Sequence, residues 1–162
     1  MTKHKQALIW ITKILNKHKL KYEVTGGLAA RAYGATRPLY DIDIMLAEED
    51  FDKIIPDVKK YIVEGPHQSK TKIWDCYFLE LKYKGIIIEF GGAYKTKFFD
   101  KTKKRWTKDI TNLEKSIKGN VLGVNVSLTP KDDLIKDKGK MGRKTDLLDI
   151  KQIQKHDKGD NK

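Results

Sequence analysis

The chain has 162 residues, of which 39% are apolar and 35% are charged. This length and composition favour one globular domain with a buried core, and they exclude both a disordered chain and a polymerase with separate subdomains. The single cysteine, Cys76, excludes a disulfide framework, and neither a signal peptide nor an apolar run of membrane-spanning length is recognisable, so we expect a cytoplasmic protein with no membrane contact.

The formal net charge is +12, from 34 basic and 22 acidic residues. A charge of this size favours a polyanionic partner such as nucleic acid. Lysine far outnumbers arginine, although arginine is the more specific phosphate ligand, so a lysine-rich solvated surface explains the charge equally well. Composition alone leaves both interpretations open.

The first elements of the chain lead into a pair of glycines. Apolar residues recur at helical spacing over residues 3–19, which predicts an amphipathic helix, and a strand is expected over 20–25. Gly26 and Gly27 follow and open a short helix-prone segment, 28–33. Glycines let backbone N–H groups approach an anion, and a helix N-terminus attracts phosphate.

An acidic pair comes next. Residues 41–46 alternate acidic and apolar with a period of two, which places Asp41 and Asp43 on one face of a strand. Their Cα atoms would lie about 6.5–7 Å apart, and their repulsion would be roughly 2–2.5 kcal/mol at an effective dielectric near 20. A hard divalent cation such as Mg²⁺ or Mn²⁺ would offset that repulsion. A phosphate cradle beside such a pair describes a nucleoside-triphosphate (NTP) site, in which Arg37 is a candidate phosphate ligand or else a solvent-exposed charge.

The middle of the chain predicts a hairpin with strands 71–83 and 86–90. The two-residue turn between them places Glu80 directly opposite Glu89. Like charges facing each other destabilise a hairpin, so this register predicts a cation or a proton between them. Glu80 is therefore either a general base for an acceptor hydroxyl or a solubilising charge at the hairpin edge.

Segment 95–108 is the most basic part of the chain, with seven cations and one acid. Phe98, Phe99 and Trp106 are interleaved with the cations. This pattern suits a nucleic-acid backbone with stacked bases. It also suits a loop whose aromatic rings enter the core while its lysines stay solvated.

The remaining elements are structural in our interpretation. They are a helix over 47–58, a loop over 65–69, a strand over 121–129, a helix pair over 132–150, and a flexible tail over 155–162 that follows a domain of residues 1–154.

Gly26-Gly27, followed after thirteen residues by Asp41-Ile42-Asp43 and later by an acidic strand, resembles the nucleotidyltransferase superfamily with the DNA polymerase β-type fold. The resemblance covers about residues 7–46, 73–91 and 126–153. It is strongest to small one-domain members, which include lincosamide and aminoglycoside nucleotidyltransferases, MNT antitoxins and AbiEii-type toxins. It implies an α/β (α+β) fold, with a small mixed, twisted sheet and helices packed mainly on one face.

The resemblance also implies an enzyme that transfers a nucleoside monophosphate from an NTP to an acceptor hydroxyl and releases pyrophosphate. Asp41 and Asp43 would hold one Mg²⁺ on the triphosphate, and Asp43 and Glu89 would hold a second. Glu89 matches the third carboxylate of the family, where many members have aspartate, and Lys138 matches a lysine that faces the nucleotide phosphates. The acceptor stays open between an RNA end, a partner-protein side chain and a small molecule. The alternative is a catalytically silent nucleotide- or RNA-binding module, such as an antitoxin-like partner subunit.

Overall fold

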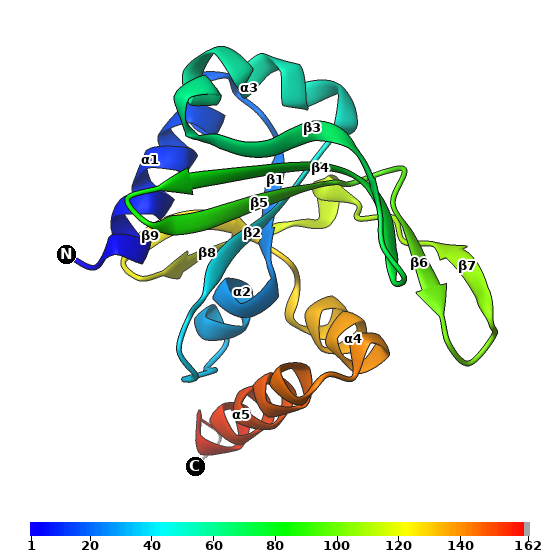
Figure 1. Ribbon diagram of the computed structural model, residues 1–162. Coiled ribbons are helices and arrows are strands. Elements are labelled where there is room, and N and C mark those ends of the chain that lie inside the picture. Colours follow the sequence, from blue (N-terminus) through cyan, green and yellow to red (C-terminus); the bar gives the residue numbers. More distant parts are fainter. Residues whose placement is uncertain (161–162) are drawn as a thin grey trace.

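A mixed, open β-sheet runs through the protein, with helices packed around it (Figure 1). The computed structural model describes residues 1–160. The helices of this part of the chain are α1 (Lys3–Lys17), α2 (Gly26–Ala32), α3 (Phe51–Val58), α4 (Lys131–Met141) and α5 (Lys144–Asp160). The strands are β1 (Tyr22–Thr25), β2 (Asp41–Leu46), β3 (Ile62–Lys70), β4 (Trp74–Tyr83), β5 (Ile86–Gly92), β6 (Lys97–Asp100), β7 (Arg105–Lys108), β8 (Ile117–Val121) and β9 (Val124–Leu128).

Strand β2 lies in the interior of the sheet. The strand order is β7-β6-β4-β5-β2-β1-β9-β8. Strand β3 lies off this path and pairs with the edge of β4 that faces away from β5. Strand β2 pairs with β5 in parallel and with β1 in antiparallel orientation, while β1 also pairs with β9 in parallel. The two neighbours of β2 therefore bring residues far apart in the sequence beside its acidic residues.

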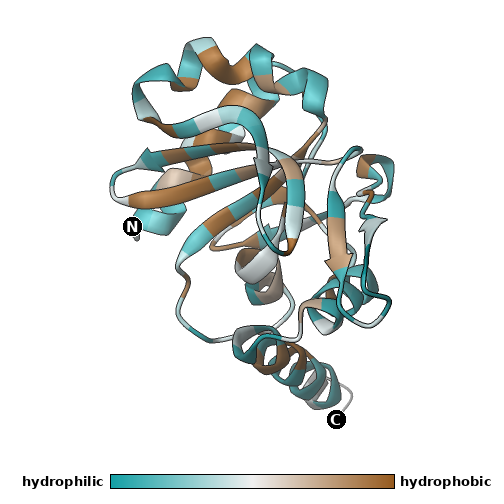
Figure 2. Ribbon diagram, turned by 45° about the vertical axis from the view of Figure 1, so that its right-hand side comes forward, coloured by the Kyte–Doolittle hydropathy of each residue, from teal (hydrophilic) through white to brown (hydrophobic). Residues whose placement is uncertain are grey.

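The core forms on one face of these central strands. Burial alternates along β2, so that Ile42, Ile44 and Leu46 are buried while the residues between them are only half-buried. Helix α1 packs against β2, β5 and β9, and its Leu8 and Ile11 are fully buried in the same cluster. Figure 2 shows hydrophobic stretches along the central strands and on the helices. The opposite, acidic face of β2 is left for the site.

Several predictions from periodicity are confirmed. Helix α1 lies within the predicted range 3–19, β2 spans 41–46, and the helix pair is present at the C-terminal end. The hairpin of β4 and β5 has the predicted register, with Glu80 opposite Glu89. The mixed α/β fold is also as expected. None of the helices in residues 1–160 combines the length and apolarity needed to cross a bilayer.

The loop predicted over 65–69 is wrong, because these residues belong to β3. Glycine and proline favoured a loop, but β3 pairs only with β4 and is therefore an edge strand, where proline is tolerated. The register shifts between Glu64 and His67, so a bulge accommodates Gly65 and Pro66 while the pairing continues on both sides.

Two further segments differ from the prediction. The single strand expected over 121–129 is a hairpin, because Leu122 and Gly123 adopt positive φ angles of 54° and 76° and reverse the chain between β8 and β9. Segment 95–108, for which a loop was one of two interpretations, contains the hairpin of β6 and β7.

Helix α5 continues through Asp160, into the stretch expected as a tail, and residues 161–162 lie outside the described part of the chain.

Candidate active site

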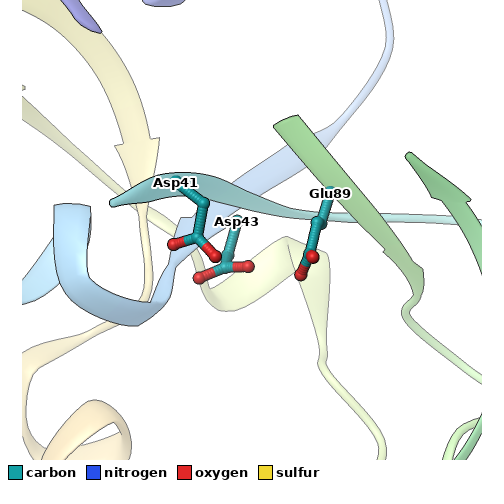
Figure 3. Close-up of side chains that lie close together, drawn as sticks. All are labelled: Asp41, Asp43 and Glu89. Atoms are coloured by element: carbon teal, nitrogen blue, oxygen red, sulfur yellow. The ribbon is translucent and has the colours of Figure 1, made fainter. Parts of the chain in front are cut away.

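Three carboxylates meet on the half-buried face of β2 and β5. The parallel register places Asp43 beside Glu89, and Asp41 precedes Asp43 by two residues on the same face of β2. Carboxylate oxygens of the three residues lie within 4.8 Å of one another. Their side chains point to the same side of the strands (Figure 3). The alternation that buries Ile42 and Ile44 is what turns the acids to this side.

The cluster carries more negative charge than its surroundings neutralise. Burial raises the pKa of Asp43 well above its usual range, and the charges of Asp41 and Glu89 raise it further. Burial also raises the pKa of Glu89, with Asp41 and Glu80 adding to the effect. Three oxygen donors at this spacing, two of them with a raised pKa, fit a hard divalent cation such as Mg²⁺ or Mn²⁺.

The glycine pair lies against this cluster. The antiparallel register places Thr25 opposite Asp43, so Gly26 begins α2 beside the carboxylate. Gly26 has φ +64°, and a Cβ atom there would overlap the Asp43 carboxylate. A Cβ atom on Gly27 would lie 2.7 Å from Nη2 of Arg37. The Thr25 side chain does not cap the helix, so the first backbone N–H groups of α2 stay available to an anion.

A buried acid on α5 holds two cations at the site. Asp149 is fully buried and accepts hydrogen bonds from Nε and Nη2 of Arg37, at 2.6 and 2.9 Å. It also pairs with Nζ of Lys138 at 2.8 Å, and Lys138 is only 5% exposed. Asp146 lies 3.5 Å from the same Nζ and accepts from Nε of Arg143 at 2.7 Å. Helix α5 therefore fixes the positions of three cations, which are Arg37 from the connection before β2, Lys138 from α4 and Arg143 from the residue before α5.

One cavity of about 700 Å³ collects these groups. Nearly all residues that the sequence predicted for the site line it, namely Gly26, Gly27, Arg37, Asp41, Asp43, Glu89 and Lys138. Glu80 is not among the lining residues, although it lies opposite Glu89 across the β4–β5 pair. Glu64, which faces Glu80 from β3, does line the cavity.

A second acidic wall of the cavity was not predicted. It consists of Glu23 on β1, Asp109 after β7 and Asp137 on α4. Glu23 is 3% exposed and accepts hydrogen bonds from the hydroxyls of Ser116 and Thr129, both at 2.7 Å. Burial, reinforced by Asp109, raises the pKa of Asp137 to about 6. The three acids come from distant segments without a common spacing, so no sequence pattern pointed to them.

The protein resembles known proteins in structure, but its sequence has no significant match among family models or curated proteins. Among solved structures, the Thermotoga maritima protein TM1012, provisionally described as a nucleotidyltransferase, superposes with a TM-score of 0.69 and 22% identity, over 88% of each chain. The chain has the nucleotidyltransferase fold.

Two antibiotic-modifying proteins share this nucleotidyltransferase fold. The lincosamide antibiotic adenylyltransferase LnuA, solved with lincomycin, has a TM-score of 0.62 and 15% identity over 95% of this chain and 97% of its own. ANT(2")-Ia, solved in complex with adenylyl-2"-tobramycin, has a TM-score of 0.64 and 13% identity over 94% of this chain and 88% of its own. The match therefore extends over nearly the whole chain and not over the site strands alone.

We expect Asp43→Asn to stabilise the metal-free protein. The folded state raises the pKa of Asp43, so the unfolded chain releases this proton at lower pH, and stability is lost as pH rises through the raised pKa. At pH 7 the substitution should increase the free energy of unfolding by about 1–2 kcal/mol, measured by urea denaturation in a chelating buffer. Asp52→Asn, at an exposed position of α3, is the control and should change it by less than about 0.5 kcal/mol. A destabilised Asp43→Asn protein would contradict the electrostatic argument.

Asp149→Asn should have the opposite effect on stability. It leaves Arg37 and the buried Lys138 without their shared counter-ion, and breaking such a buried pair costs about 3–5 kcal/mol. Asp157→Asn on the same helix breaks the exposed pair with Lys131 and should cost less than about 1 kcal/mol. Thermal and urea denaturation of both variants provide the measurement, and equal losses would show that Asp149 does not hold these cations in solution.

Proposed function

We propose that the protein is a Mg²⁺-dependent nucleotidyltransferase that moves a nucleoside monophosphate from an NTP to an acceptor hydroxyl in the cytoplasm. The observation that carries this proposal is the convergence of Asp41, Asp43 and Glu89 at one wall of a cavity whose other residues include Lys138. The fold shared with two antibiotic-modifying proteins supports the reaction class and leaves the acceptor open.

The acids would hold the metal ion, and the cations would hold the phosphates of the NTP. Asp41, Asp43 and Glu89 would hold the divalent ion, which when bound supplies charge neutralisation at the triphosphate and lowers the pKa of the acceptor hydroxyl. Lys138 and Arg37, held by Asp149, would contact phosphate oxygens, and the open N–H groups of Gly26 and Gly27 would bind the same anion through the backbone.

The proposed reaction is a displacement at phosphorus. The acceptor oxygen forms a bond to the α-phosphorus, and the bond from that phosphorus to the bridging oxygen breaks, so that pyrophosphate leaves. The rigid placement of the cations favours the aligned geometry that this displacement needs.

The hydroxyl proton needs a base, and Glu80 is our candidate. It lies opposite Glu89 at the edge of the carboxylate cluster, but it does not line the cavity, so it would accept the proton through an intervening water. Its charge also raises the pKa of Glu89, which gives it a second means of acting on the site.

Asp43→Ala should abolish NTP turnover and most Mg²⁺-dependent nucleotide binding while the fold persists. Calorimetry with ATP, GTP, CTP and UTP, with and without Mg²⁺, measures the binding. Labelled NTPs incubated with cell extract, then separated into RNA, protein and small molecules, measure the transfer and identify the acceptor class. Asp52→Ala is the matched control. Normal turnover in Asp43→Ala would remove the assignment, and metal-independent nucleotide binding without transfer would indicate a catalytically silent module instead.

Glu80→Gln should lower the rate of label transfer by about 10²-fold and leave the affinity for the NTP unchanged, because a base acts in the transition state and not in nucleotide binding. Glu49→Gln, on the exposed turn before α3, is the control. A full rate in Glu80→Gln would limit this residue to a structural or solubilising role.

A further inference from the structure

Residues 95–108, which contain the hairpin of β6 and β7, form a strongly basic arm at one end of the sheet (Figure 1). Its cations are all exposed, and they are Lys95, Lys97, Lys101, Lys103, Lys104, Arg105 and Lys108. Within residues 1–160, none of these side chains forms an ion pair. The only acid of the arm, Asp100, accepts backbone N–H groups of Thr102 and Lys103 and so shapes the turn. The positive charge of the arm is therefore available to a partner.

The aromatic rings of the arm pack on each other and on Trp74 of β4, and not in the core. Phe99 contacts Trp106 edge-on, with ring centroids 5.5 Å apart, and Phe98 contacts Trp74 at 5.2 Å. Nζ of Lys70 lies 5.1 Å from the centre of the Trp106 ring. All four rings are half-buried, and none belongs to the hydrophobic clusters of the described residues. The interpretation in which these rings enter the core is therefore not the arrangement that the structure has.

Backbone hydrogen bonds hold the arm in place. The N–H of Phe99 donates to the carbonyl of Ile73 at 2.8 Å, and the N–H of Asp109 donates to that of Thr96 at 2.9 Å. At its base, the N–H of Thr111 donates to the carbonyl of Ala93 at 2.7 Å. The arm is thus a preformed surface, which reduces the entropy lost when a partner binds.

The arm leads directly into the candidate active site. Trp74 and Phe98 line the same cavity as the three carboxylates. A smaller cavity of about 220 Å³ lies between the arm and α4, and Phe99, Lys101 and Lys140 are among its lining residues. Half-buried aromatic rings at the base of the basic arm therefore share one cavity with the acidic residues.

We propose that this arm binds a single-stranded RNA and presents its 3′ hydroxyl to the site as the acceptor, an inference that rests on the proposed function. Exposed lysines suit the phosphate backbone, and half-buried rings suit unpaired bases, which a duplex does not offer. Glu23, Asp109 and Asp137, which line the same cavity, would repel a further phosphate, so a terminal nucleoside fits beside them better than an internal one. An anionic membrane fits less well, because Trp74 and Phe98 face the cavity and all four rings are half-buried.

The proposed step extends the RNA by one nucleotide. The 3′ oxygen of the RNA forms a bond to the α-phosphorus of the NTP. The bond from that phosphorus to the oxygen that bridges to the β-phosphorus breaks, pyrophosphate leaves, and the hydroxyl proton passes to solvent through the base. No oxidant or further reactant is needed.

Binding is tested without any NTP, so that it is independent of catalysis. Fluorescence anisotropy with a short labelled single-stranded RNA compares the protein with the variant Lys101→Gln, Lys103→Gln, Lys104→Gln, Arg105→Gln. We expect at least about tenfold weaker binding and a salt dependence that is less steep by up to about three units, since each lost phosphate contact removes about 0.7 units. The control removes four exposed lysines elsewhere, by Lys13→Gln, Lys59→Gln, Lys60→Gln and Lys118→Gln, and should bind RNA almost as the unaltered protein does.

Catalysis is tested separately with labelled NTP and RNA that carries either a free or a chemically blocked 3′ end. Label should enter only the free end, and Asp43→Ala should bind RNA normally without transferring label. Equal RNA affinity of the two fourfold variants would overturn the inference. So would equal binding of single-stranded DNA or anionic vesicles, or label transfer that ignores the blocked end. Retained RNA binding with no NTP turnover in any form would overturn the proposed function and the acceptor role, and leave the arm as an RNA-binding surface.

Discussion

Electrostatic repulsion among Asp41, Asp43 and Glu89 is the constraint on which the site depends. The pleat of β2 and its parallel pairing with β5 force the three carboxylates onto one face, because the opposite face is occupied by the apolar core. The fold therefore keeps an arrangement that destabilises it in the absence of a cation. Such a conflict between stability and local charge is typical of functional sites, where the ligand resolves it.

The second organising element is a buried ion-pair network centred on Asp149. It joins Arg37, from the connection before β2, to Lys138 on α4, and so ties the helix pair to the carboxylate strands. A buried network of this kind adds little net stability but specifies one arrangement of its members. Here that arrangement places two cations at the cavity that the carboxylates also line.

Charge in this protein is segregated in space. The net charge of +12 does not describe the cavity, whose walls combine two groups of acids with the cations Arg37, Lys138, Lys140 and Arg143. The unpaired cations of the β6–β7 arm lie outside it, beside the aromatic rings that lead inward. A nucleic-acid strand would therefore be attracted to the arm, while the acids of the cavity would disfavour its internal phosphates, which is a physical basis for selecting its end over internal positions.

The sequence by itself determined the local elements and the core of the site. Period-two alternation predicted β2 and the shared face of Asp41 and Asp43, and the short turn of the β4–β5 hairpin predicted Glu80 opposite Glu89, because these patterns depend only on neighbours in the chain. Only the tertiary structure decided what lies beside them. Three features depend on contacts between segments as far as 112 residues apart, and no local spacing encodes such contacts. They are the pairing of Arg37 and Lys138 with Asp149, the acidic wall of Glu23, Asp109 and Asp137, and the position of the β6–β7 arm beside the cavity. Edge strand β3 escaped prediction for a related reason, since its tolerance of Pro66 comes from its place in the sheet.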